Sequence, residues 1–241
     1  MIEAICFDLD DTLFDYTGLV KAALSYLCDE MALITGRSSR ECSMAYSRVK
    51  DALYKDKPAD PAVFDWRDRI RRTLELMGAR GSDAEVEALY RSFWTRFLSM
   101  IEPFPDVRPG LEALRRLGKK IAVVSNGTRE QQSQKLERLG LLDFFECQVY
   151  SEDVGVNKPH PSVFRRCLEL LDVDPQRAMM AGDLCYIDVY GARRVGMVTC
   201  WVKRNGLPIG RPRRPSEFPD FTVRNLQELA RLVQVDRSLQ S

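Results

Sequence analysis

The sequence predicts an α/β protein in which a mainly parallel sheet is interrupted, after its first strand, by a helical-bundle insert. Two observations support this fold class. An apolar run at residues 4–7 is followed by a long segment that has helical periodicity only. From about residue 106 onward, short apolar runs alternate with helical segments, which is the pattern of a parallel sheet with right-handed crossovers. We therefore expect an α/β core at 1–15 and 106–241 and a helical domain at 16–105.

Composition and charge are those of an ordinary globular protein. The chain has 241 residues, of which 45% are hydrophobic, enough for a sizeable buried core. Its 36 Lys and Arg against 35 Asp and Glu give a formal charge of +1, so no global field favours nucleic acid or an anionic membrane. The chain does not open with a signal-peptide pattern, and no run reaches the roughly 20 apolar residues of a membrane helix, so we expect a cytoplasmic protein. Seven scattered cysteines without a C-x-x-C pair, and a single histidine, His160, argue against a zinc site.

Four amphipathic helices are expected in the insert. The segments with apolar residues at helical spacing are 20–31, 45–53, 66–77 and 86–100. Ser38 with Glu41, and Ser82 with Glu85, have the spacing of capping boxes at the expected starts of two of these helices. The pattern is typical of a small helical bundle.

The rest of the chain alternates strands and helices. The strands are expected at 121–124, 147–150, 178–181 and 197–202. The helices between them are expected at 129–139, 162–171 and 187–194. Ligands of open parallel sheets bind beyond the carboxyl ends of the strands, so the polar residues that end the apolar runs should meet in one crevice.

Seven polar residues follow these apolar runs. They are Asp8, Asp10, Ser125, Asn126, Lys158, Asp183 and Asp188. Because buried carboxylates repel one another, a cation is expected among them, and hard oxygen ligands favour Mg²⁺. The set suits phosphoryl transfer, in which one carboxylate attacks phosphorus and a second exchanges a proton with the leaving group and with water. Ser125, Asn126 and Lys158 are the candidates for binding the phosphate oxygens.

Four motifs, in order, resemble those of the haloacid dehalogenase superfamily, in the phosphatase branch with a helical cap inserted after the first motif. They are "DLDDT", "VVSNGT", "NKPHPSVF" and "GDLCYIDVYGA". The resemblance implies a Rossmann-like core in which Asp8 is the nucleophile and Asp10 the general acid and base, with Ser125 and Lys158 completing the catalytic set. It also implies Mg²⁺ bound by Asp8, Asp183 and the main-chain carbonyl of Asp10. Asp188 is then implied to support the metal or Lys158 without being a direct metal ligand.

Asp10 points to phosphate esters as substrates. The dehalogenases of the superfamily lack an aspartate at this position, because displacement of a halide needs no proton for the leaving group. One departure is Leu184, where relatives commonly have a small polar residue, and it puts the role of Asp188 in question. Thr12 is expected to brace the first loop by hydrogen bonding, and Asp11 to stabilise its turn.

The resulting prediction is a Mg²⁺-dependent phosphomonoester hydrolase that acts on a small phosphorylated metabolite through an aspartyl-phosphate intermediate. A sugar phosphomutase that uses the same intermediate, and a non-catalytic phosphometabolite-binding protein, stay open as alternatives. The four motifs contact only the phosphate and the metal, so the substrate, and the choice between a monomer and a homodimer, are left open.

Two arginine-rich stretches carry further expectations. In "VFDWRDRIRR", Trp66, Ile70 and Leu74 are expected to pack the bundle. The arginines of that stretch are candidates for facing a substrate: Arg67, Arg69, Arg71 and Arg72. "RNGLPIGRPRRPSEFPD", residues 204–220, is expected to be an exposed, solvated loop, because it lacks the aromatic interleaving and broad basic face of a nucleic-acid site.

Overall fold

The computed structural model describes residues 1–204 and 210–238, and the chain divides into two compact units. One unit comprises Met1–Asp15 and Glu102–Ser241, and the other comprises Tyr16–Ile101. The insert therefore begins directly after the loop that follows the first strand.

The chain re-enters the first unit through a short pairing with that same loop. Phe14 forms an isolated antiparallel bridge with Pro103, and the N–H of Phe104 donates to the carbonyl oxygen of Leu13 at 3.0 Å. These contacts join residues 103 and 104 to the loop after β1, within the first unit.

The first unit is built on a six-stranded sheet, all of whose pairings are parallel, with the strand order β3-β2-β1-β4-β5-β6. The strands are β1 (Ala4–Phe7), β2 (Lys120–Ser125), β3 (Cys147–Tyr150), β4 (Ala178–Gly182), β5 (Val198–Val202) and β6 (Phe221–Val223). In the register of the sheet, Ile5 of β1 lies opposite Ile121 of β2 and Met179 of β4. Strand β1 is thus central and fully buried, and its carboxyl end opens between the ends of β2 and β4.

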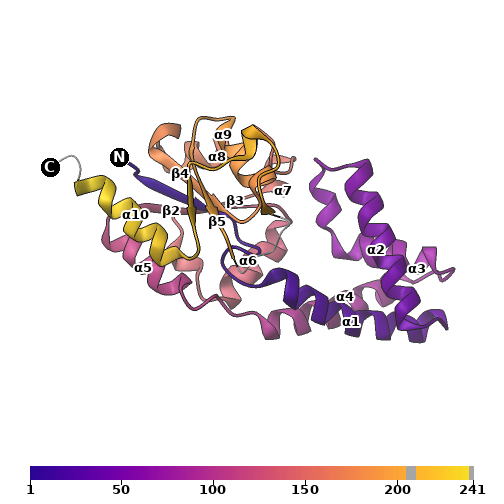
Figure 1. Ribbon diagram of the computed structural model, residues 1–241. Coiled ribbons are helices and arrows are strands. Elements are labelled where there is room, and N and C mark those ends of the chain that lie inside the picture. The colour runs from indigo at the N-terminus through magenta and orange to yellow at the C-terminus, as the bar shows by residue number, and fades with distance from the viewer. Residues whose placement is uncertain (205–209, 239–241) are drawn as a thin grey trace. The chain divides into compact units, whose positions relative to one another are not determined.

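Helices cover both faces of this sheet, with α8 and α9 on one side and α5 and α10 packed together on the other (Figure 1). The helices of the unit are α5 (Val107–Arg116), α6 (Arg129–Arg138), α7 (Ser151–Val154), α8 (Pro161–Leu171), α9 (Tyr190–Arg193) and α10 (Leu226–Ser238). Helix α8 begins at Pro161 because His160 is its N-cap, with Nδ1 accepting from the Ser162 N–H at 3.3 Å. Its apolar face, including Phe164, is buried against the sheet, and each such large side chain contributes about 1.5–3 kcal/mol by leaving water.

The second unit is a helical bundle. Its α-helices are α1 (Tyr16–Thr35), α2 (Ser39–Asp56), α3 (Trp66–Leu76) and α4 (Asp83–Met100), and the structure describes this unit completely. Both expected capping boxes are present, at Ser38 and Glu41 for α2 and at Ser82 and Glu85 for α4. The bundle core is aromatic, with the rings of Trp66 and Phe93 packed 4.1 Å apart between centroids.

The arginines of α3 have partners inside the bundle. Arg67 pairs with Glu87 at 2.7 Å, Arg71 with Asp83 at 2.8 Å and Arg72 with Asp68 at 2.8 Å. Arg69 is 3% exposed; its guanidinium donates to the carbonyl oxygen of Val63 and to the hydroxyls of Tyr46 and Tyr54. Trp66, Ile70 and Leu74 are buried, as the periodicity predicts.

The predicted helix at 187–194 differs most from the structure. A turn of π-helix spans Cys185–Val189 and the α-helix α9 follows at Tyr190–Arg193. The backbone starts to coil earlier because the Leu184 carbonyl oxygen accepts from the N–H groups of Ile187 and Asp188. Strand β6 was not predicted, since only Val223 of its three residues is buried and no alternation is visible.

No helix in the described part of the chain is long and apolar enough to cross a membrane. All seven cysteines are free thiols, and all but Cys147 are buried.

Candidate active site

The loop after β1 turns back on itself immediately beyond the sheet. The N–H of Asp8 still donates to the carbonyl oxygen of Ala181 in the ladder with β4, at 2.9 Å, whereas Leu13 donates to Leu9. Asp11 has φ +58°, a left-handed conformation that aspartate tolerates better than most residues. This tight turn places Asp8 and Asp10 at the carboxyl end of the central strand.

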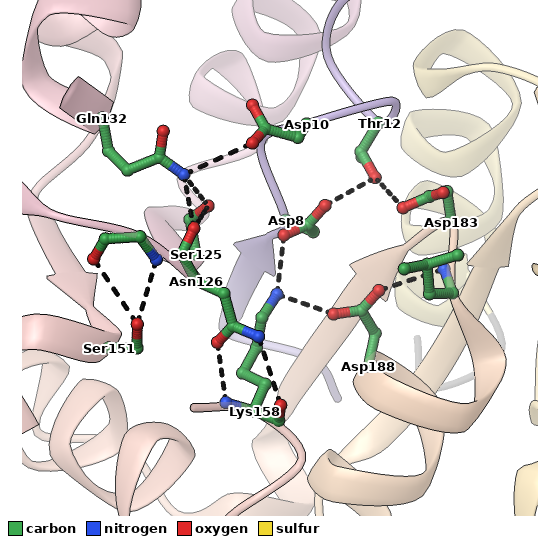
Figure 2. Close-up of polar contacts among 12 residues, drawn as sticks. Asp8, Asp10, Thr12, Ser125, Asn126, Gln132, Ser151, Lys158, Asp183 and Asp188 are labelled. Atoms are coloured by element: carbon green, nitrogen blue, oxygen red, sulfur yellow. Dashed lines mark hydrogen bonds and ion pairs between the residues drawn. The ribbon is translucent and has the colours of Figure 1, made fainter. Parts of the chain in front are cut away.

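Lys158 joins two carboxylates at the centre of the site (Figure 2). Its Nζ lies 2.6 Å from Oδ1 of Asp8 and 2.7 Å from Oδ1 of Asp188, and the lysine is 3% exposed. Burial alone lowers the pKa of a lysine, but the two carboxylates outweigh it and raise the pKa of Lys158 above its usual value. Lys158 is therefore a buried lysine held between two carboxylates at the carboxyl end of β1.

The loop that carries Lys158 is fixed by Asn126. The side-chain amide of Asn126 donates to the Lys158 carbonyl oxygen at 3.2 Å, and its oxygen accepts from the Lys158 N–H at 2.7 Å. Asn126 follows β2, so this amide ties the ends of two crossover connections together.

Asp183 closes the carboxylate cluster from the end of β4. Carboxylate oxygens of Asp8, Asp183 and Asp188 all lie within 4.8 Å of one another. Burial, and repulsion by Asp8 and Asp188, raise the pKa of Asp183 well above its usual range. Three hard oxygen donors with unfavourable mutual repulsion fit a divalent cation such as Mg²⁺.

Gly182 allows this cluster to be compact. A Cβ at Gly182 would lie 2.4 Å from Oδ2 of Asp188, closer than atoms can approach. The same Oδ2 accepts from the N–H of Leu184 at 3.1 Å. The bulky Leu184 thus does not displace Asp188, because only its main chain takes part.

Thr12 lies between two of the carboxylates. Its hydroxyl oxygen is 3.4 Å from Oδ2 of Asp8 and 3.4 Å from Oδ1 of Asp183, both long distances for a hydrogen bond (Figure 2). The Thr12 hydroxyl thus lies near Asp8 and Asp183, and its role in bracing the first loop stays a prediction.

Ser125 ends β2 at the same carboxyl edge of the sheet and is 1% exposed. Its hydroxyl oxygen accepts from Nε2 of Gln132 at 2.7 Å, and Gln132 donates to the Asn126 carbonyl oxygen at the same distance. Gln132 belongs to α6 and was not predicted as a site residue.

Asp10 points away from the carboxylate cluster, toward α6. Nζ of Lys135 lies 2.9 Å from Oδ1 and 2.8 Å from Oδ2 of Asp10, and Lys135 is 4% exposed. Burial raises the pKa of Asp10 to about 6, although Lys135 opposes this shift. Lys135 was also missed; the only sequence signal is that Gln132 and Lys135 are three residues apart and share a helix face.

Arg204 corrects the expectation that the whole stretch 204–220 is solvated. Its side chain is 9% exposed, pairs with Asp106 at 2.6 Å and donates two hydrogen bonds to the Thr12 carbonyl oxygen. Burying a charged guanidinium requires such partners, which the sequence around it does not reveal. Arg211, Arg213 and Arg214 are exposed as expected, and residues 205–209 lie outside the described part of the chain.

All seven residues predicted from the strand ends therefore lie in one unit at the carboxyl edge of the sheet. Asp8, Lys158, Asp183 and Asp188 form one charged cluster, and Asp10 is linked to Ser125 through Gln132, which lies 3.5 Å from Asp10 Oδ2.

Known proteins match this chain over most of its length. The family model of haloacid dehalogenase-like hydrolases matches residues 2–196. The chain is 32% identical to glyceraldehyde 3-phosphate phosphatase of Methanopyrus kandleri, over 97% of each chain.

Two solved structures share the fold. The crystal structure of a HAD phosphatase from Thermococcus onnurineus superposes with a TM-score of 0.75 at 30% identity, over 96% of this chain and 98% of that one. A 2-haloacid dehalogenase from Pseudomonas syringae pv. Tomato DC3000 gives a TM-score of 0.73, also at 30% identity, over 98% and 99%. With the family model covering residues 2–196, the chain belongs to the haloacid dehalogenase-like hydrolases and is an enzyme of that family.

Proposed function

We propose that this protein is a Mg²⁺-dependent phosphomonoester hydrolase that acts on a small phosphorylated metabolite through an aspartyl-phosphate on Asp8. The observation that carries the proposal is the position of Asp8. This residue follows β1 directly in the chain, and its carboxylate lies 2.6 Å from the buried ammonium of Lys158. Asp10 supplies a second carboxyl group from the same loop. A nucleophile, a proton donor and a cation for phosphate oxygens thus come together at one strand end.

In the first half-reaction, an oxygen of Asp8 forms a bond to phosphorus while the bond from phosphorus to the leaving oxygen breaks. The protonated carboxyl group of Asp10 gives its proton to that oxygen, so the product leaves as a neutral alcohol. In the second, Asp10 takes a proton from water as the water oxygen attacks phosphorus. The bond from phosphorus to Asp8 breaks, inorganic phosphate leaves and both aspartates return to their starting states.

Ser125 and Lys158 are the groups we assign to the non-bridging phosphate oxygens. Their donors are buried and held by neighbours, so little reorganisation is needed as charge develops on those oxygens. Both ends of the Asn126 amide bind the main chain of Lys158, which supports a role in fixing the phosphate-binding loop.

Asp8, Asp183 and the main-chain carbonyl of Asp10 are the residues that would hold Mg²⁺. The fit rests on the carboxylate oxygens of Asp8 and Asp183, which lie within 4.8 Å of each other; burial, together with repulsion by Asp8 and Asp188, raises the pKa of Asp183. When bound, Mg²⁺ supplies positive charge that offsets the carboxylates and the phosphate oxygens. Asp188 orients Lys158 through their 2.7 Å contact.

For substrate selection we assign the helical unit Tyr16–Ile101 the role of a cap, with the catalytic residues on the α/β core. The name of the Methanopyrus kandleri relative makes glyceraldehyde 3-phosphate the first compound to test.

The test is phosphate release by the purified protein from glyceraldehyde 3-phosphate and a panel of sugar phosphates, nucleotides and other phosphorylated metabolites, with Asp8→Asn as the matched control. We expect Mg²⁺-dependent phosphate release by the wild type and none by Asp8→Asn. An isomerised sugar phosphate without free phosphate would identify a mutase, and halide release from a 2-haloacid would identify a dehalogenase. Binding without turnover across the panel would identify a binding protein, and each of these results contradicts the proposal.

A further inference from the structure

Lys135 is a buried cation that contacts both oxygens of a single carboxylate. Its Nζ lies 2.9 Å from Oδ1 and 2.8 Å from Oδ2 of Asp10. The side chain of Lys135 is 4% exposed and that of Asp10 is 24% exposed, so Lys135 is enclosed while part of the Asp10 side chain stays accessible. An ammonium between the two oxygens leaves further lone pairs on each of them for a proton.

Stability alone does not account for such a pair. Taking an ammonium and a carboxylate out of water costs several kcal/mol per ion, and replacing a buried pair by apolar side chains is often neutral or stabilising. Lys119 shows another way to bury a lysine in the same unit: it is 5% exposed, and its Nζ donates to the Ile2 carbonyl oxygen. The Nζ of Lys135, by contrast, contacts the carboxylate of Asp10 in the candidate active site.

Helix α6 also contacts the end of β2, where Ser125 and Asn126 lie. Gln132, one turn before Lys135, is 1% exposed and bonds Ser125 and the Asn126 carbonyl oxygen, both at 2.7 Å. Thr128 caps this helix, its hydroxyl accepting from the Gln131 N–H. One face of α6 therefore holds both the end of β2 and the side chain of Asp10.

We propose that Lys135 is a positioning residue that fixes the carboxyl group of Asp10 for proton transfer to the leaving oxygen. The inference rests on the proposed function, because it assigns a task to Lys135 in that reaction. Lys135 acts through Asp10 and contacts neither the phosphate nor the leaving group. A misplacement of the proton donor by about 1 Å is enough to cost about 10²-fold in rate.

The test compares Lys135→Met with Lys135→Arg and with Lys119→Met, the matched removal of a buried ammonium near the opposite ends of the strands. Release of the leaving group is measured in single turnovers, with an alkyl phosphate and with p-nitrophenyl phosphate. We expect Lys135→Met to slow the release of the leaving group from the alkyl phosphate by about 10²-fold, with KM changed less than about twofold. The loss with p-nitrophenyl phosphate should be smaller, because its leaving group departs without a proton.

The same measurement on Asp10→Asn and on the double variant Asp10→Asn/Lys135→Met isolates the coupling. If Lys135 works through Asp10, removing it from the Asp10→Asn background costs nothing more in the first step. The double variant carries no charge at either position, so it leaves no buried unpaired carboxylate. Its comparison with Asp10→Asn therefore stays valid even if Lys135→Met alone folds poorly. Lys135→Arg should recover part of the lost rate, and Lys119→Met should retain the wild-type ratio between the two substrates.

Equal losses for both substrates, a change confined to KM, or full additivity with Asp10→Asn would overturn the assignment of Lys135. Each of these outcomes is read on an enzyme whose wild type releases phosphate. A wild type without turnover contradicts the proposed function instead, so the two failures are distinct.

Discussion

The ammonium of Lys158 lies 2.6 Å from the carboxylate of Asp8, which projects from the end of the central strand. Asp188, on the other side of the same ammonium, is only 1% exposed. Lys158 thus offsets part of the negative charge that three clustered carboxylates would otherwise leave in a buried place.

Lys158→Met should lower both stability and activity. Removing one partner of a buried ion pair typically costs about 3–5 kcal/mol, because the remaining charges stay buried. Denaturant unfolding of Lys158→Met should therefore give a smaller free energy of unfolding, with turnover lost. The double variant Lys158→Met/Asp188→Asn should recover part of the stability and none of the activity. A double variant as unstable as the single one would show that the contact between Lys158 and Asp188 carries little of the effect.

Gly182→Ala should impair the active site. The added Cβ would lie 2.4 Å from Oδ2 of Asp188, so Asp188, and with it Lys158, must shift. We expect kcat to fall at least about 10-fold, in line with the rate cost of misplaced groups. Gly110→Ala is the matched control, since its Cβ would lie 2.5 Å from Cβ of Leu226 in the packing of α5 on α10.

The two glycine variants should thus separate catalysis from packing. Gly110→Ala should lower the melting temperature while the folded protein keeps its kcat. Normal kcat in Gly182→Ala would mean that the position of Asp188 does not matter for the reaction.

Arg204→Met should loosen the loop that carries Asp8 and Asp10. The guanidinium donates to the Thr12 carbonyl oxygen and pairs with Asp106, and hydrogen bonds to charged groups contribute about 1.5–3 kcal/mol. We expect a lower free energy of unfolding and a lower kcat. Arg204→Lys should restore neither the stability nor kcat, since a single ammonium cannot reproduce the guanidinium contacts with both the Thr12 carbonyl oxygen and Asp106. Arg211→Met, at an exposed position, should leave both unchanged, and equal behaviour of the two methionine variants would contradict the role of Arg204.

Mg²⁺ should raise the melting temperature of the wild type and restore the activity that EDTA removes. A ligand that binds only the folded state stabilises it, and here the cation also relieves repulsion among the carboxylates. Asp183→Asn should lose the thermal shift, because a neutral amide is a weaker ligand. A full Mg²⁺-dependent shift in Asp183→Asn would place the metal elsewhere.

The sequence predicted the part of the site that follows from strand order. Apolar runs mark buried strands, and the residues after them had to meet at one edge, so Asp8, Ser125 and Asp183 could be placed without coordinates. The π-helical turn before α9 could not be predicted, because it depends on the Leu184 carbonyl oxygen accepting from the N–H groups of both Ile187 and Asp188. Arg204 was misjudged because its partner Asp106 is distant in the sequence.

Lys135 and Gln132 were missed for a different reason. Helix α6 reads "REQQSQKLER", a polar run typical of a solvated surface, yet Gln131, Gln132, Lys135 and Leu136 are all buried. Polar groups can be buried when they bond one another, and such pairing depends on the tertiary structure rather than on periodicity.

The most direct test of the central claim is the covalent state of Asp8 during turnover. The wild type, mixed with Mg²⁺ and a phosphorylated substrate and quenched in acid within one turnover, should carry one phosphoryl group on the peptide that contains Asp8, as read by mass spectrometry. That group should vanish as free phosphate appears and should be absent in Asp8→Asn. Phosphate release by the wild type without a phosphoryl group on Asp8, or release by Asp8→Asn at the wild-type rate, would contradict the mechanism proposed for this enzyme.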